Sequence, residues 1–102
     1  MNYLEITGIV ASDPVQRELA DGTSTLSWRV KVEREESGND SIPCTINTST
    51  APKSLVTKVQ KIALGQNLEI SGKLRSRFWQ GPKGNGSRIE VEVDSVKRIS
   101  KT

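Results

Sequence analysis

The segment from Lys73 to Arg88 combines side chains that could bind a nucleic acid. It carries five positive charges, on Lys73, Arg75, Arg77, Lys83 and Arg88, together with two adjacent aromatic rings and no acidic residue. Cations attract phosphates, and an aromatic face can stack a base of any identity. Because a duplex hides the faces of its bases, this combination favours a single-stranded nucleic acid over a duplex.

The spacing of these residues predicts that they share one surface. If Leu74 and Phe78 lie in a strand and face a core, the alternation of a strand points the residues between them the other way. That opposite face then carries a row of cations that ends in an indole: Lys73, Arg75, Arg77 and Trp79. We therefore predict that the cations follow the phosphates and that Trp79 stacks a base.

The distribution of charge along the chain supports this interpretation. Residues 1–40 carry eight acidic and four basic side chains, whereas residues 41–89 carry eight basic and one acidic. The net charge of the whole chain is only +3, so the segregation is more informative than the total. The alternative is that the basic residues only solvate the surface of a small domain. The Phe78–Trp79 pair inside the basic run favours binding.

Length and composition indicate one small domain that spans residues 1–102. Hydrophobic residues make up 33% of the chain and aromatic residues 4%, so we expect a small core and further burial in an oligomer. Cys44 is the single cysteine, which excludes an intrachain disulfide and suits a reducing cytoplasm. We see neither a signal peptide nor an apolar run of membrane-spanning length, and we expect a cytoplasmic protein without membrane contact.

The residue types argue against an enzyme. The chain has no histidine, so the usual zinc and haem ligand sets and the nucleophile–histidine pairs are missing. Glu90, Glu92 and Asp94 alternate with apolar residues, which is typical of the solvated face of a strand whose other residues point inward. We predict no catalytic residue, no metal and no cofactor.

Periodicity and turn signals predict mainly strands with one helix. Alternation of apolar and polar residues predicts strands over 3–10, 23–34, 42–48, 66–78 and 88–99, with the first strand resuming over 15–19, while helical spacing predicts a helix over 52–64 that ends at Gly65. Asp21-Gly22 and the segment 80–86 are predicted hairpin turns, with Lys83 at the apex of the second.

The same alternation predicts which side chains form the core. Trp28 shares the apolar face of its strand with neighbours such as Leu26, and we assign it to the core rather than to ligand binding. Cys44 is expected to be a small packing residue. The other core positions are expected on the last two strands: Leu68, Ile70, Leu74, Phe78, Ile89, Val91 and Val93.

The predicted order is three strands, one helix and two further strands. Five coiled strands with glycine-assisted bends favour a small closed barrel, and this order is the layout of the oligonucleotide-binding (OB) fold. The fold class is therefore all-β with one helix, in a five-stranded OB-fold barrel.

With these elements in place, the sequence resembles the bacterial single-stranded DNA-binding protein family over nearly its whole length. The matching stretches are LEITG at 4–8 with Asp13-Pro14, WRVKV at 28–32, and LGQNLEISGKLRSRFW at 64–79, which is the most specific. The resemblance implies that Trp79 stacks on DNA and that Arg75 and Arg77 contact it. It also implies roles in replication, repair or recombination, with proteins of these processes as candidate partners.

The chain departs from that family in two respects. Residues 34–50 contain no aromatic side chain, although family members usually carry DNA-facing aromatics there. The sequence also lacks the low-complexity tail and acidic tip of the family, so we expect a short form. The primosomal replication protein N family is a similarly short relative.

The resemblance also implies a homo-oligomer, either a dimer or a tetramer, assembled through the first strand. Leu4, Ile6 and Ile9 are the candidate interface residues. Two other functions stay open from the sequence. One is a primosome-type module that binds proteins and contacts DNA secondarily, and the other is an RNA or oligosaccharide binder on the same barrel, since a fold does not fix its ligand.

Overall fold

Six strands and one short helix make up the protein. The structure is a computed structural model that describes residues 1–99, apart from the side chain of Trp79. The elements in chain order are β1 (Leu4–Val10), β2 (Val15–Glu18), β3 (Ser24–Glu33), β4 (Asn39–Asn47), α1 (Lys53–Gln60), β5 (Asn67–Gly81) and β6 (Gly84–Arg98). Among residues 1–99, no helix has the length and apolar character needed to span a membrane.

Five of the strands pair into a closed ring. β1 pairs with β5, β5 with β6, β6 with β4, β4 with β3, and β3 returns to the end of β1. All of these pairs are antiparallel except β4 with β6, which is parallel and brief, joining Cys44 to Val91 and Thr45 to Glu92. β2 is a short strand that pairs with residues 24–27 of β3, on the edge of β3 that does not pair with β4. The ring and its strand order have the OB-fold arrangement predicted from the sequence.

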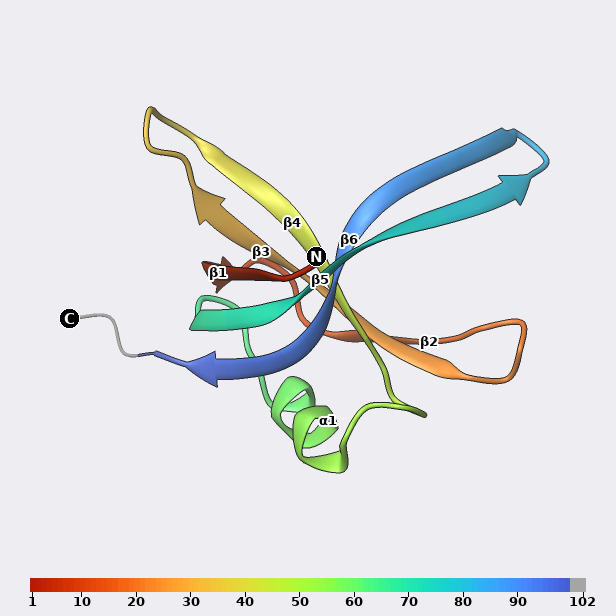
Figure 1. The fold of residues 1–102 in the computed structure, drawn as a ribbon, viewed down its shortest axis with the longest axis horizontal. Coiled ribbons are helices and arrows are strands. Elements are labelled where there is room, and N and C mark those ends of the chain that lie inside the picture. The colour runs from red at the N-terminus through yellow and green to blue at the C-terminus, as the bar shows by residue number, and fades with distance from the viewer. Residues whose placement is uncertain (100–102) are drawn as a thin grey trace.

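Two long hairpin arms leave the ring on the side away from helix α1 (Figure 1). One arm is the outer part of β3 and β4, and the other is the outer part of β5 and β6. Gly72 stands where β5 changes register against β6, at a bulge between Ser71 and Gly72. A Cβ atom at Gly72 would lie 2.2 Å from the carbonyl oxygen of Glu92, so only glycine fits this close approach. Glycine at this position therefore lets β5 and β6 approach each other closely at the bulge.

The core fills the ring and is closed at one end by the helix. Trp28 is 2% exposed and packs with residues from all the ring strands, and Leu55 and Val59 of α1 join the same cluster. The sequence-based assignment of Trp28 to the core is confirmed. Cys44 is also buried, and desolvation by burial raises the pKa of its thiol to about 12, so it is a packing residue without thiolate character.

Leu74 and Phe78 do not face the core, contrary to the sequence-based prediction. Their exposed fractions are 52% and 79%. Ile89, which was also expected to point inward, is 61% exposed. The physical reason for Phe78 and Ile89 is the shortness of the β4–β6 pairing: from Ile89 to the tip, β6 pairs only with β5, so this part of the arm has no strand beside it. Leu74 lies opposite Val91, at the end of that pairing. Alternation in the sequence continues past the point where the core ends.

Glu90 is a second exception, because it is buried rather than solvated. Its exposed fraction is 3%, although the sequence placed it on the solvent face of its strand. It precedes Val91, which pairs with Cys44, and it contacts Arg77 and Arg88. The carboxylate is thus enclosed where the arm joins the ring.

The helix and the second hairpin turn are both shorter than predicted. Helix α1 ends at Gln60, and Gly65 lies in the following connection, where its N–H donates to the carbonyl oxygen of Val10 at 3.0 Å. The positive φ of Gly65 therefore serves this turn and not a helix cap. In the hairpin, pairing continues to Gly81 opposite Gly84, so only residues 82–83 form the turn and Lys83 stands at its apex.

Candidate nucleic-acid interface

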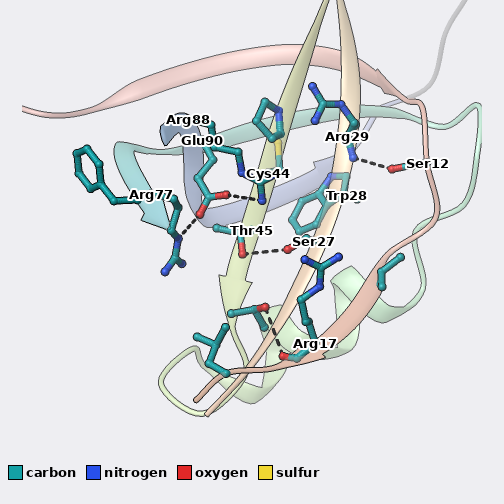
Figure 2. Close-up of a pocket in the computed structure, with 15 residues that line it drawn as sticks. Ser12, Arg17, Ser27, Trp28, Arg29, Cys44, Thr45, Arg77, Arg88 and Glu90 are labelled. Carbon is teal, nitrogen blue, oxygen red and sulfur yellow. Dashed lines mark hydrogen bonds and ion pairs between the residues drawn. The ribbon is translucent and has the colours of Figure 1, made fainter. Parts of the chain in front are cut away.

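A groove of about 640 Å³ lies across β2, β3 and β4 and reaches the base of the β5–β6 arm (Figure 2). We call it the arginine groove after four of its lining residues, which come from four strands: Arg17 of β2, Arg29 of β3, Arg77 of β5 and Arg88 of β6. Glu90 is its one acidic lining residue in the part of the chain that the structure describes. The groove therefore carries an excess of positive charge.

Strand pairing explains which side chains line the groove. Ser27 pairs with Thr45, and their hydroxyl oxygens lie 3.4 Å apart; Arg29 pairs with Pro43. These residues lie on the outer face of the β3–β4 pair, because the residue between Ser27 and Arg29 on β3 is the core residue Trp28. The alternation that buries the indole of Trp28 thus presents Arg29 to the groove.

Arg17 and Arg29 carry the uncompensated charge of the groove. The Nε atom of Arg29 donates to Oγ of Ser41 at 2.7 Å, and its backbone N–H donates to Oγ of Ser12 at 2.9 Å. Within residues 1–99 neither arginine forms an ion pair with a carboxylate. A hydroxyl partner orients the guanidinium of Arg29 without neutralising it, so its charge is available to a phosphate.

The predicted row of cations lies on one face of the β5–β6 arm, but it is not free. Arg75 pairs with Glu92 at 2.5 Å, and Lys73 lies 3.5 Å from the same carboxylate. Arg77 and Arg88 both pair with Glu90, Arg88 at 3.3 Å. Of the five cations that the sequence places between residues 73 and 88, Lys83 at the hairpin tip is the one for which the described residues provide no ion pair. The basic run from 73 to 88 contains no acid, yet the hairpin folds the acids of residues 90 and 92 back onto it.

The ion pairs change the titration of Glu92. Its partial burial pushes the pKa of the carboxyl upward, but the hydrogen bond from Arg75 and the charges of Arg75 and Lys73 together outweigh that effect. The pKa of Glu92 therefore lies below its ordinary value, and the carboxylate is ionised at neutral pH.

Two aromatic residues line the groove, the buried Trp28 and the exposed Phe78. Phe78 is 79% exposed and lines the groove beside Arg77 and Arg88. Sequence reasoning missed Phe78 as a site residue because it assigned alternate residues of this strand to a core that ends before them. The side chain of Trp79 lies outside the described part of the structure, and only its backbone pairing with Gly86 is described.

Arg17 and Arg29 were also missed by sequence reasoning, although a signal existed for Arg29. Arg29 follows the buried Trp28 directly, and alternation alone places it on the opposite face. For Arg17, nothing in the sequence indicates that β2 pairs with β3 at this position and brings the guanidinium to the groove. The structure therefore extends the predicted site from the arm to the ring.

The candidate oligomer residues lie on a strand with one open edge. β1 pairs with β5 from Leu4 to Ile9, but it pairs with β3 only at Ile9 and Val10. From Leu4 to Gly8 the other edge of β1 has no partner strand in the described chain. Leu4 and Ile6 are partly buried against the core cluster, whereas Ile9 is partly buried without belonging to it.

No group of three or more potential metal-ligating side chains (His, Cys, Asp or Glu) gathers anywhere in residues 1–99 as described. The acidic residues that meet in the site region, Glu90 and Glu92, instead contact cations. The residues gathered in the site offer charged groups, hydrogen-bonding groups and an exposed aromatic ring.

Solved structures share this fold, and two of them illustrate the similarity. The dimeric structure of the N-terminal domain of PriB protein from Thermoanaerobacter tencongensis matches with a TM-score of 0.70 at 18% sequence identity, and the match covers 98% of each chain. The Plasmodium falciparum SSB complex with ssDNA matches with a TM-score of 0.78 at 14% identity, over 98% of this chain and 96% of that chain. At these identities the similarity establishes the fold, and it confirms the predicted OB-fold class.

Comparison of sequences gives the family. No curated protein sequence matches the chain significantly. The sequence model of the Single-strand binding protein family, in contrast, matches residues 1–99, which include every element described above. The resemblance inferred from the motifs at 4–8, 28–32 and 64–79 is confirmed, and the chain belongs to the single-strand binding protein family.

Proposed function

We propose that this protein binds single-stranded DNA, with little base preference, along the arginine groove. The observation that carries the proposal is the position of two uncompensated guanidinium groups, Arg17 and Arg29, in the same groove as the exposed ring of Phe78. Guanidinium groups bind phosphates, and an exposed aromatic ring can stack an unpaired base. Membership of the single-strand binding protein family and the DNA held by the Plasmodium falciparum SSB support this choice of ligand.

The groove favours a single strand for a physical reason. A base can reach the face of Phe78 only if it is unstacked and unpaired, and a duplex would have to open to allow this. Phosphate contacts carry no sequence information, and stacking tolerates every base. The proposed activity is therefore binding and protection of single strands during replication or repair, without a chemical step.

We propose that the bound DNA strand continues from the groove along the β5–β6 arm. In this proposal Lys73, Arg75, Arg77, Lys83 and Arg88 contact phosphates as the strand leaves the groove, and Trp79 supplies a second stacking surface. This proposal is supported by the position of these residues on one hairpin arm, whose residues Arg77, Phe78 and Arg88 also line the groove.

The proposal is tested by titration of fluorescently labelled oligonucleotides at two salt concentrations. We expect oligo-dT of about 16 nucleotides, an upper site size for one OB fold, to bind far more tightly than a duplex hairpin of equal length. Oligo-U serves as the control for RNA. Equal affinity for the hairpin and for oligo-dT would contradict the proposal, and stronger binding of oligo-U would replace DNA by RNA as the ligand.

We infer further that the protein assembles through the open edge of β1. Pairing of the free edge from Leu4 to Gly8 with its symmetry mate would satisfy its backbone groups and add groove surface to each complex. The dimeric structure of the PriB domain, which shares the fold, is consistent with assembly. Repetition of a groove with few stacking residues would raise the overall affinity by avidity.

Light scattering tests this assembly. We expect a dimer or tetramer at micromolar concentration, and a lower mass for Ile9→Lys. Ile9 is chosen because its side chain lies outside the core cluster, so that the variant can fold, which a thermal melt would verify. A monomeric parent protein would refute the inference and leave the groove to act alone.

A further inference from the structure

We propose that Glu90 and Glu92 are internal competitors of DNA phosphates. In the free protein their carboxylates occupy the anion positions between four cations of the β5–β6 arm, and binding of single-stranded DNA must displace or share them. The inference rests on the proposed function, and it makes the two glutamates determinants of affinity rather than parts of a solvated strand face.

The first anion position lies at the base of the arm. Arg77 on β5 and Arg88 on β6 are directly opposite each other in the strand register, which places two like charges side by side. The Nε atom of Arg77 donates to one carboxylate oxygen of Glu90, and a terminal nitrogen of Arg88 lies 3.3 Å from the other oxygen. One anion thus bridges two cations from neighbouring strands (Figure 2).

The bridging carboxylate is buried, whereas its cations are not. Glu90 is 3% exposed, while 34% of the Arg77 side chain and 47% of the Arg88 side chain remain exposed. Both arginines also line the arginine groove, so a phosphate that enters the groove meets cations whose charge is already partly neutralised.

The second anion position repeats this arrangement two residues further along β6. Glu92 accepts from Arg75 at 2.5 Å through one oxygen and lies 3.5 Å from Nζ of Lys73 through the other. Both cations are about half exposed. Two carboxylates therefore hold four of the five cations that the sequence assigned to phosphate binding.

These contacts have two opposite consequences that an experiment can separate by sign. If the glutamates mainly hold the cations in position for DNA, removing their charge lowers the affinity. If they mainly compete, removing their charge raises it. We infer that competition is the stronger effect, because each carboxylate takes the place that a phosphate oxygen would need, and because all four cations stay partly exposed and can exchange a carboxylate for a phosphate.

The size of the effect follows from the strength of exposed ion pairs. Such pairs stabilise a protein by an amount that corresponds to a factor of about 1.4 to 5 in an equilibrium constant. We therefore expect Glu92→Gln, whose ion pairs are partly exposed, to raise the association constant for oligo-dT about two- to fivefold, and Glu90→Gln, whose carboxylate is buried, to change it in the same direction. The slope of log affinity against log salt should become steeper by about 0.7 for each phosphate that gains a cation.

The experiment compares four proteins: the parent, Glu90→Gln, Glu92→Gln and the matched control Asp94→Asn. Asp94 lies on the same strand and is exposed, and it forms no ion pair within the described residues. Its variant removes the same charge without releasing a cation. Binding of oligo-dT is measured by fluorescence anisotropy across a salt series, and thermal melts establish that each variant is folded.

Higher affinity and a steeper slope for the two glutamine variants, and a smaller gain for Asp94→Asn, would support competition. Lower affinity in a folded variant, or an equal gain in all three, would overturn it and leave the proposed function intact. Glu92 is only partly buried, so its variant keeps the test valid if Glu90→Gln fails to fold. If the parent itself binds no oligo-dT under any salt condition, the proposed function fails and the competition inference fails with it.

Discussion

Replacing Phe78 by alanine should weaken the binding of single-stranded DNA without destabilising the protein. The ring is 79% exposed, so truncation removes little buried surface, and the free energy of unfolding should change by less than about 0.5 kcal/mol. Stacking of one base on an aromatic side chain is worth about 1–3 kcal/mol. The dissociation constant for oligo-dT should therefore rise about 5- to 150-fold if Phe78 is a stacking residue.

Two control variants separate stacking from other contributions. Phe78→Leu keeps an apolar side chain but loses the π-face, and Phe78→Trp keeps the face. Ile89→Ala removes an exposed apolar side chain from the same arm that does not line the groove. We expect loss of affinity in Phe78→Leu, affinity near or above the parent in Phe78→Trp, and parent-like binding in Ile89→Ala.

Fluorescence anisotropy of labelled oligo-dT provides the measurement, and chemical denaturation of each variant provides the stability. Unchanged affinity in Phe78→Ala would refute the assignment of Phe78 to the groove chemistry and would leave Trp79 as the candidate stacking residue. A large loss of stability would show that Phe78 is buried in an oligomer, although it is exposed in the single chain.

Three further outcomes are expected. Trp28→Ala should destabilise the fold by about 3–5 kcal/mol, because the indole is 2% exposed in the core. Denaturation followed by circular dichroism would measure this loss. A loss below about 1 kcal/mol, far less than expected for a large buried side chain, would contradict the core assignment. Arg29→Gln should make the salt slope of oligo-dT binding shallower by about 0.7, while Lys58→Gln on helix α1 should leave it unchanged. A slope unaffected by Arg29→Gln would place the phosphates elsewhere. The pKa of Glu92 is lower in the folded protein than its ordinary value of 4.5, so the ionised carboxylate stabilises the fold at pH values above 4.5. This stabilisation is lost as the pH falls through the lower pKa of the folded state. The melting temperature should therefore fall in acid, and it should fall less in Glu92→Gln. Equal acid sensitivity in both proteins would show that this ion pair adds nothing.

The sequence was sufficient for the fold because the signals that define it are local and repeated. Alternation over 23–34 fixed Trp28 as a core residue, and the glycine-marked turns gave the order of strands. The expected glycine-assisted bends are represented by Gly72, where a Cβ atom would lie 2.2 Å from the Glu92 carbonyl oxygen. Family motifs such as the segment 64–79 indicated which fold the strands form, because these motifs contain the same core residues and glycines that define the strands and turns.

The extent of the core was decided only by the tertiary structure. Leu74 and Phe78 follow the same alternation as Leu68 and Ile70, yet the first two are exposed and the last two are buried. Periodicity reports which side of a strand a residue occupies, but not whether another element covers that side. Opposite Phe78, β6 pairs only with β5, so no further strand lies beside this part of the hairpin, and no local pattern indicates where the pairing with β4 ends.

The state of the candidate site also depended on tertiary structure. The sequence by itself determined that cations gather between residues 73 and 88 on alternate positions of a strand, and this was enough to indicate single-stranded nucleic acid. Only the folded hairpin brought Glu90 and Glu92 opposite those cations, and only the pairing of β2 with β3 brought Arg17 toward Arg29. Charge along a chain is a local property, whereas the net field in a groove depends on which distant charges the fold brings within a few ångströms.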